Sequence, residues 1–119
     1  MKYLMMIYGN QEKWESMPAE EWPEVIAAQD AFNKRFMESG ELLGAYGLAD
    51  AVDSRLVRRV DGAPAVTDGP YLETKEYMAS FYLLDVDSEA RALEIAAAMP
   101  GADQFPIEVW PVPHEAPRP

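Results

Sequence analysis

The stretch TDGPYLETKEYMASFYLLDV, residues 67–86, governs the fold because a stiff corner leads directly into a long apolar segment. Gly69 can adopt dihedral angles that are closed to other residues, and Pro70 restricts both its own φ and the residue before it. Asp68 can accept hydrogen bonds from amides two or three residues further on. Successive side chains of a strand point to opposite faces, and both sets are mainly apolar over residues 77–86, which predicts a long strand with two apolar faces.

Residues 68–76 read DGPYLETKE and resemble the peptide DGPFAETKE of the DGPF-type branch of the YCII-related family. Tyr71 and Leu72 are the positions that differ, and Tyr71 keeps the aromatic ring. The opening residues MKYLMMIYG also resemble the first strand of this family, and the order of elements agrees up to about Val112. The resemblance implies a dimeric α/β barrel, no settled activity across this branch, and genes often found beside those of sigma factors.

Length and charge limit the possible partners. A chain of 119 residues with 49% hydrophobic content is expected to form one domain with a real core. Its 21 acidic and 10 basic residues give a net charge of −11, which repels phosphate backbones and anionic lipids. We therefore expect neither nucleic acid nor membrane as a partner. The apolar run from Tyr3 to Tyr8 is too short for a signal or membrane segment, so a cytoplasmic location is expected.

The composition also argues against several chemistries. The sequence has no cysteine, which excludes disulfides and thiolate nucleophiles. His114 is the single histidine and falls in the tail, so imidazole catalysis and a metal site are not expected. No glycine-rich phosphate loop is present in the sequence, and we expect no cofactor.

Periodicity along the chain predicts an α+β domain over residues 1–112 and a disordered, proline-rich tail over residues 113–119. The predicted elements are strands at 2–8, 41–47, 77–86 and 107–112, helices from Ser16 to Ser39 and from Asp87 or Ser88 to Met99, and a hairpin at 55–67. Residues 9–15 are predicted to be a loop, whereas Asp61-Gly62 suits a two-residue hairpin turn with positive φ. Apart from the hairpin insertion, the order is βαββαβ, the ferredoxin-like antiparallel sheet with two helices on one face.

That arrangement leaves the other face of the sheet without helices. Because residues 77–86 are apolar on both sides, the uncovered face would be costly in water. We therefore predict a homodimer that buries this face.

In such a sheet the first strand lies beside the strand that follows the corner, so a ligand pocket is expected at one end. Its predicted lining is Lys2, Tyr8, Gln29, Asp68, Gly69, Pro70 and Glu73. Asp68 is the candidate general acid or base, and Lys75 is its candidate electrostatic partner. This set of groups suits a small polar ligand.

Two polar features have competing interpretations. Gln29 falls on the apolar stripe of the first helix, near where the resemblance implies a histidine in the main YCII-type branch. It either binds a ligand through its amide, or is a hydrogen-bonded core residue, or lies on a helix that is rotated slightly toward solvent. Arg55, Arg58 and Arg59 either clasp an anion or guard an exposed strand edge against aggregation.

Two classes of function follow. The first is a small-molecule-binding or regulatory module, which the resemblance links to a sigma-factor system. The alternative is an enzyme that uses Asp68 for acid/base chemistry on a small polar metabolite. The absence of the implied histidine favours the first class.

Overall fold

The computed structural model describes residues 1–71 and 76–119, so the predicted site residues Glu73 and Lys75 lie outside the described residues. The chain is a mixed α+β protein with antiparallel sheets, and its described part contains three α-helices. No helix in the described ranges combines the length and the apolar character needed to cross a membrane.

The main sheet has four strands in the order β2-β5-β1-β6, and every neighbouring pair is antiparallel. The strands are β1 (Lys2–Asn10), β2 (Leu42–Gly47), β5 (Glu76–Asp85) and β6 (Ile107–Pro111). The predicted strand positions are therefore confirmed to within two residues. In the central pair, Lys2 lies opposite Asp85 and Asn10 lies opposite Glu76, so the end of β1 is beside the start of β5.

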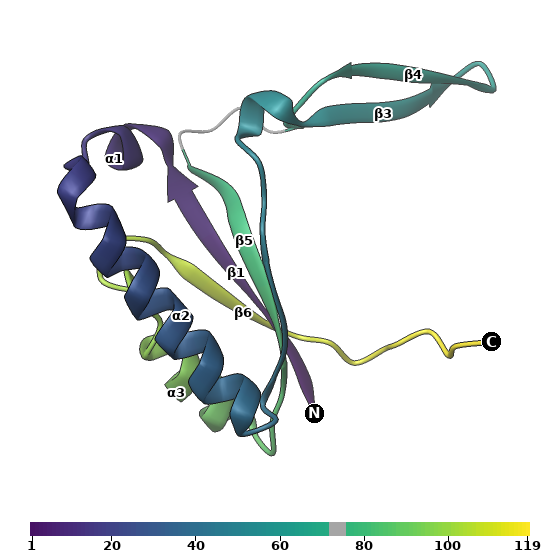
Figure 1. The fold of residues 1–119 in the computed structure, drawn as a ribbon. Coiled ribbons are helices and arrows are strands. Elements are labelled where there is room, and N and C mark those ends of the chain that lie inside the picture. Colours follow the sequence, from purple (N-terminus) through teal and green to yellow (C-terminus); the bar gives the residue numbers. More distant parts are fainter. Residues whose placement is uncertain (72–75) are drawn as a thin grey trace.

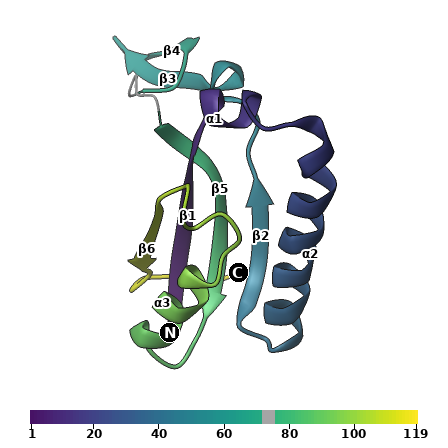
Figure 2. The same cartoon turned by 90° about the vertical axis from the view of Figure 1, so that its left-hand side faces the viewer.

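Both long helices lie on the same side of this sheet (Figures 1 and 2). Helix α2 (Trp22–Glu38) lies along β2, and α3 (Glu89–Ala97) lies against β1 and β6. Alternate strand residues point toward the helices because side chains of a strand alternate between its two faces. The buried core consists of Tyr3, Met5, Phe32, Phe36, Leu42, Tyr82, Leu84, Val86, Ala92, Ile95, Ala96 and Met99.

The first helical region differs from the prediction. Residues 9–15 were predicted to be a loop, but Gln11–Glu15 form the short helix α1. The Asn10 side-chain oxygen accepts the amides of Glu12 and Lys13 at 2.9 and 3.3 Å, which caps this helix. Ser16 therefore ends α1 and does not start α2, which follows the 3₁₀ turn η1 (Ala19–Glu21).

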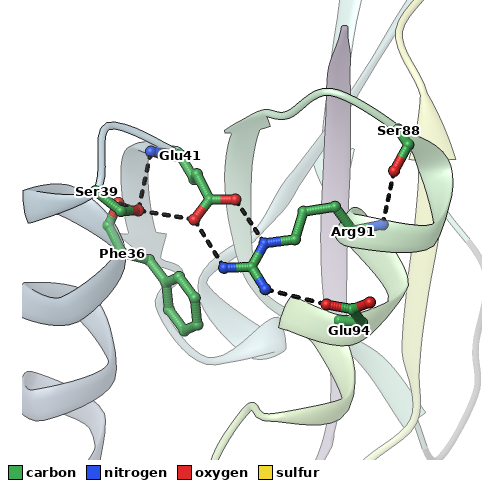
Figure 3. Close-up of polar contacts among 6 residues, drawn as sticks. All are labelled: Phe36, Ser39, Glu41, Ser88, Arg91 and Glu94. Carbon is green, nitrogen blue, oxygen red and sulfur yellow. Dashed lines mark hydrogen bonds and ion pairs between the residues drawn. The ribbon is translucent and has the colours of Figure 1, made fainter.

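A charged cluster joins the connection between α2 and β2 to helix α3 (Figure 3). Arg91 donates two hydrogen bonds to the Glu41 carboxylate, at 2.7 and 3.0 Å, and a third to Glu94 at 3.0 Å. The hydroxyl of Ser39 donates to the same Glu41 carboxylate. These contacts, with Arg91 as the main cause, lower the pKa of Glu41 to about 2. Of the two predicted starts of α3, Asp87 and Ser88, it is Ser88 that caps the helix, by accepting a hydrogen bond from the Arg91 amide.

The predicted hairpin forms a separate two-stranded sheet of β3 (Arg55–Val60) and β4 (Ala63–Asp68). Its turn residues Asp61 and Gly62 both have positive φ, of 52° and 79°, which confirms the predicted turn. Figure 1 shows the hairpin projecting from one end of the main sheet, on the side away from α2 and α3. A second 3₁₀ turn, η2 (Ala51–Asp53), precedes it.

The face of the main sheet opposite the helices carries large apolar side chains. Leu43, Tyr46 and Trp110 are each about half exposed, and Tyr46 stacks on Phe81 with 5.0 Å between ring centroids. The strand register places Met6 opposite Phe81 on this same face. We call this surface the helix-free face.

Candidate functional site

The corner after β4 is built around Ser54. The Ser54 carbonyl accepts the Gly69 amide at 3.1 Å, and the Ser54 hydroxyl donates to the Ala51 carbonyl at 2.7 Å. A Cβ atom at Gly69 would lie 2.5 Å from the Ser54 hydroxyl oxygen, so the close approach requires glycine. The peptide bond between Gly69 and Pro70 is cis. Gly69 is not among the glycines with positive φ, so the prediction that it adopts dihedral angles closed to other residues is not borne out, and glycine is needed here for its close approach to Ser54. The bond between Gly69 and Ser54 joins the base of the hairpin to the loop before it.

Two adjacent cavities lie beside this corner. One, of about 330 Å³, is lined by Leu48, Ala49, Asp50, Ala51, Asp53, Ser54, Pro70, Tyr77 and Met78. The other, of about 350 Å³, shares Asp50, Ala51 and Tyr77 and adds Gln11, Glu15 and Val52. We call the two together the corner cleft. Each part is at the lower end of the size range of small-molecule pockets.

Tyr77 and Asp50 are the polar residues that line both cavities of the corner cleft. The Tyr77 hydroxyl donates to the Gln11 side-chain oxygen at 3.0 Å, and the Tyr77 ring meets the edge of Trp14 at a centroid distance of 6.1 Å. Burial raises the pKa of the Tyr77 phenol, and the carboxylates of Asp50 and Glu15 raise it further. The phenol is therefore protonated at neutral pH and serves as a hydrogen-bond donor.

The corner cleft is acidic. Its described lining contains the carboxylates of Glu15, Asp50 and Asp53, and no lysine or arginine lines it within the described residues. Apolar groups such as Leu48 and Met78 provide the walls. A ligand that presents hydrogen-bond donors or a positive charge above an apolar body matches this lining.

Of the predicted residues on β1, only Tyr8 lies near the corner. Tyr8 is opposite Met78 in the strand register, and its pKa is raised by a hydrogen bond to Glu108, by burial and by the Glu108 charge. Lys2 lies at the other end of β1, six residues or roughly 20 Å away along an extended strand, and forms an ion pair with Glu115. The structure therefore does not bring Lys2 to the corner within one chain, although a ligand role for Lys2 stays a prediction.

Asp68 and Gln29 are likewise not brought together. Asp68 ends β4 with its side chain 94% exposed, where its carboxylate lies 3.9 Å from the Arg55 guanidinium. Gln29 lines a separate cavity of about 510 Å³, between the start of α2 and residues 100–105. Its amide donates to Asn33 at 2.9 Å, in the manner of a hydrogen-bonded glutamine on a helix. The predicted single cleft containing both residues is not observed, and their ligand and catalytic roles stay predictions.

Sequence reasoning missed Tyr77, Asp50 and Ser54 as residues of this region. Tyr77 was assigned only to a strand, although it is the first aromatic residue after the charged corner. Ser54 immediately precedes the hairpin, where a small hydroxyl residue often bonds to nearby backbone. Both signals are common in loops, so neither identifies a cleft without the fold.

The geometry defines a class of protein. It is an α+β domain with this strand order, a helix-free face, and a DGP corner beside a cleft. The model of the YCII-related domain family matches residues 1–112, and the chain belongs to this family. It is also similar to an uncharacterized protein, R00369, of Rhizobium meliloti (strain 1021). The two sequences are 29% identical over 103 residues, which cover 87% of this chain and 83% of that protein.

Proposed function

We propose that this YCII-related protein binds a small polar molecule in the corner cleft and does not transform it. The observation that carries the proposal is the cleft itself, where the protonated phenol of Tyr77 lies among carboxylates and apolar walls. Gly69 and Ser54 hold one wall of this cleft in a close backbone arrangement, in which a Cβ atom at position 69 would lie 2.5 Å from the Ser54 hydroxyl oxygen. Preorganised walls of this kind reduce the cost of binding a ligand.

The same geometry favours binding over acid/base catalysis. Asp68, the candidate acid or base, has a 94% exposed side chain and is not among the residues that line the cleft. A catalytic acid or base must reach its substrate within hydrogen-bond distance. The groups around a ligand at Tyr77 can therefore bind and orient it. Asp68 lies outside the cleft, at the base of the hairpin.

We further propose that the working form is a homodimer, in which two ferredoxin-like sheets pack through their helix-free faces into an α/β barrel. The order β2-β5-β1-β6 and the placement of both helices on one side support this arrangement. Half-exposed Leu43, Tyr46 and Trp110 would lose unfavourable contact with water in such an interface.

The test is a thermal-shift screen with small amines, amino acids and polyols on the wild type and two variants. A ligand of the corner cleft should raise the melting temperature of the wild type, and the shift should shrink in Tyr77→Phe, which removes only the hydroxyl. Asp68→Asn is the matched control and should retain the wild-type shift. If a compound stabilises Tyr77→Phe fully, the cleft is not its site. If Asp68→Asn alone abolishes binding or turnover, the enzymatic alternative replaces this proposal.

A further inference from the structure

The hairpin of β3 and β4 has little support from the rest of its own chain. Within the described residues, these two strands pair only with each other, and Figure 1 shows them extending beyond the main sheet. The radius of gyration is 16.6 Å, compared with roughly 13.5 Å for a compact chain of this length. An isolated two-stranded hairpin is marginally stable in water, so it gains from a surface to pack on.

The two faces of the hairpin differ in how well they are covered. Val57 and Val66 are directly opposite each other, and both are more than 60% exposed. Since side chains alternate along a strand, Arg55 and Arg59 lie on this same face, on either side of Val57. The same register places Pro64 and Asp68 on this side, where the Asp68 carboxylate lies 3.9 Å from the Arg55 guanidinium. We call the side formed by Arg55, Val57, Arg59, Pro64, Val66 and Asp68 the open face.

The opposite side of the hairpin is partly covered by its own chain. Leu56 and Ala65 are half-buried there, and the guanidinium of Arg58 lies 5.2 Å from the centre of the Tyr71 ring. Val60 on this side is also 53% exposed, but it lies opposite the small Ala63, so of the two sides only the open face has two exposed valines opposite each other with an arginine on either side. Arginine beside apolar residues is a composition enriched in protein interfaces.

The charge of the hairpin is opposite to that of the rest of the molecule. Residues 55–68 hold three of the 10 basic residues of the chain and two of its 21 acidic ones. The remainder therefore carries 19 acidic residues against seven basic ones. A second copy of this chain offers the open face a strongly acidic partner surface, whereas the net charges of the two copies outside their hairpins repel each other.

The direction of the hairpin points to the same partner. In Figure 1 the hairpin extends on the side of the sheet that α2 and α3 leave uncovered, and the chain end after β6 extends on that side too. Anything seated on the helix-free face would lie beside the hairpin. In a twofold arrangement each copy would hold the other in the same way.

We propose that the β3–β4 hairpin is a clamp that packs its open face against a second copy of this chain, with Arg59 paired to a carboxylate of the partner. The inference rests on the homodimer of the proposed function and adds a second contact outside the helix-free face. It also assigns Arg59 a role beyond keeping a strand edge soluble.

The test compares two variants of the full chain with the same composition change on opposite faces. Val57→Ser with Arg59→Glu alters the open face, and Val60→Ser with Arg58→Glu alters the other face. Sedimentation velocity should show a dimer dissociation constant at least about tenfold higher for the open-face variant, and less than about threefold higher for the control. The open-face effect should diminish at 1 M salt because the ion pairs are screened.

Three outcomes would overturn the clamp. Equal effects of the two variants, or no effect of either, would mean that the hairpin does not contact a second copy through its open face. A monomeric wild type would remove the dimer as well, while leaving the ligand screen at Tyr77 unaffected. Binding of duplex DNA or anionic vesicles that is lost with Arg59→Glu would assign the arginines to a polyanion instead.

A second measurement uses the wild type alone, in case the variants fold poorly. Hydrogen exchange of the β3 and β4 amides should slow as the protein concentration rises through the dimer range. Exchange that stays fast at every concentration would also refute the clamp.

Discussion

The Glu41 carboxylate provides a quantitative prediction, because Arg91 holds its pKa at about 2 compared with an ordinary 4.5. A depressed carboxyl pKa stabilises the folded state above the unfolded pKa, and this stability is lost as the pH falls through the folded pKa. The shift corresponds to roughly 3 kcal/mol at most, at 1.36 kcal/mol for each pKa unit. Because the Arg91 side chain is 38% exposed, solvent screening reduces the expected contribution to roughly 1–2 kcal/mol.

We therefore expect Glu41→Gln to lower the free energy of unfolding by about 1–2 kcal/mol at pH 7. Denaturant melts at pH 7 and pH 3 should show the difference between wild type and variant falling to less than half at the lower pH. Glu94→Gln is the matched control, since Glu94 bonds the same Arg91 but is 66% exposed, and it should cost about 0.5 kcal/mol or less. Equal losses in the two variants, or a loss for Glu41→Gln that does not change with pH, would refute the assignment.

Three further substitutions test the local geometry by denaturant melts. Gly69→Ala places a Cβ 2.5 Å from the Ser54 hydroxyl oxygen, so we expect a loss of roughly 1–3 kcal/mol, and a variant as stable as wild type would contradict this packing. Gly9→Ala brings a Cβ to 2.4 Å from the Trp14 ring and should cost a similar amount, with altered tryptophan fluorescence as a second readout. Ser88→Ala removes the cap of α3 and should cost about 1 kcal/mol, whereas Ser88→Asp should retain most of the stability.

Several elements could be predicted from sequence because their signals are local. The apolar pattern of β5, the Asp61-Gly62 turn and the Ser88 cap each depend on a few adjacent residues. The start of the first helical region could not be predicted so well. Asn10 and Ser16 are both good cap residues, and the hydrogen bonds from the Glu12 and Lys13 amides to the Asn10 side chain show that the helix α1 begins at the earlier one.

The position of Gln29 depended on information that the sequence does not hold. The apolar stripe of α2 is buried at Phe32 and Phe36, but Trp22 and Val25 on the same stripe are 38% and 39% exposed. The amino-terminal part of α2 therefore faces the groove near residues 100–105 and not the sheet. Periodicity gives the side of a helix that is apolar, whereas the length over which that side meets a sheet depends on the tertiary packing.

The corner cleft and the hairpin share one structural joint, formed by Ser54, Gly69 and Pro70, so ligand binding and dimerisation both act on it. Ser54 and Pro70 line the cleft, while the bond from the Gly69 amide to the Ser54 carbonyl closes the base of the hairpin. If a second copy holds the hairpin and a ligand occupies the cleft, each biases the same joint, and thermodynamic linkage makes their effects reciprocal. We therefore expect a cleft ligand to change the dimer dissociation constant by the same factor by which dimerisation changes the ligand affinity. Sedimentation at saturating ligand measures the first factor, and ligand titration below and above the dimer range measures the second. A ligand that leaves the dimer dissociation constant unchanged, and whose own affinity is the same below and above the dimer range, would show that this joint does not couple the two sites.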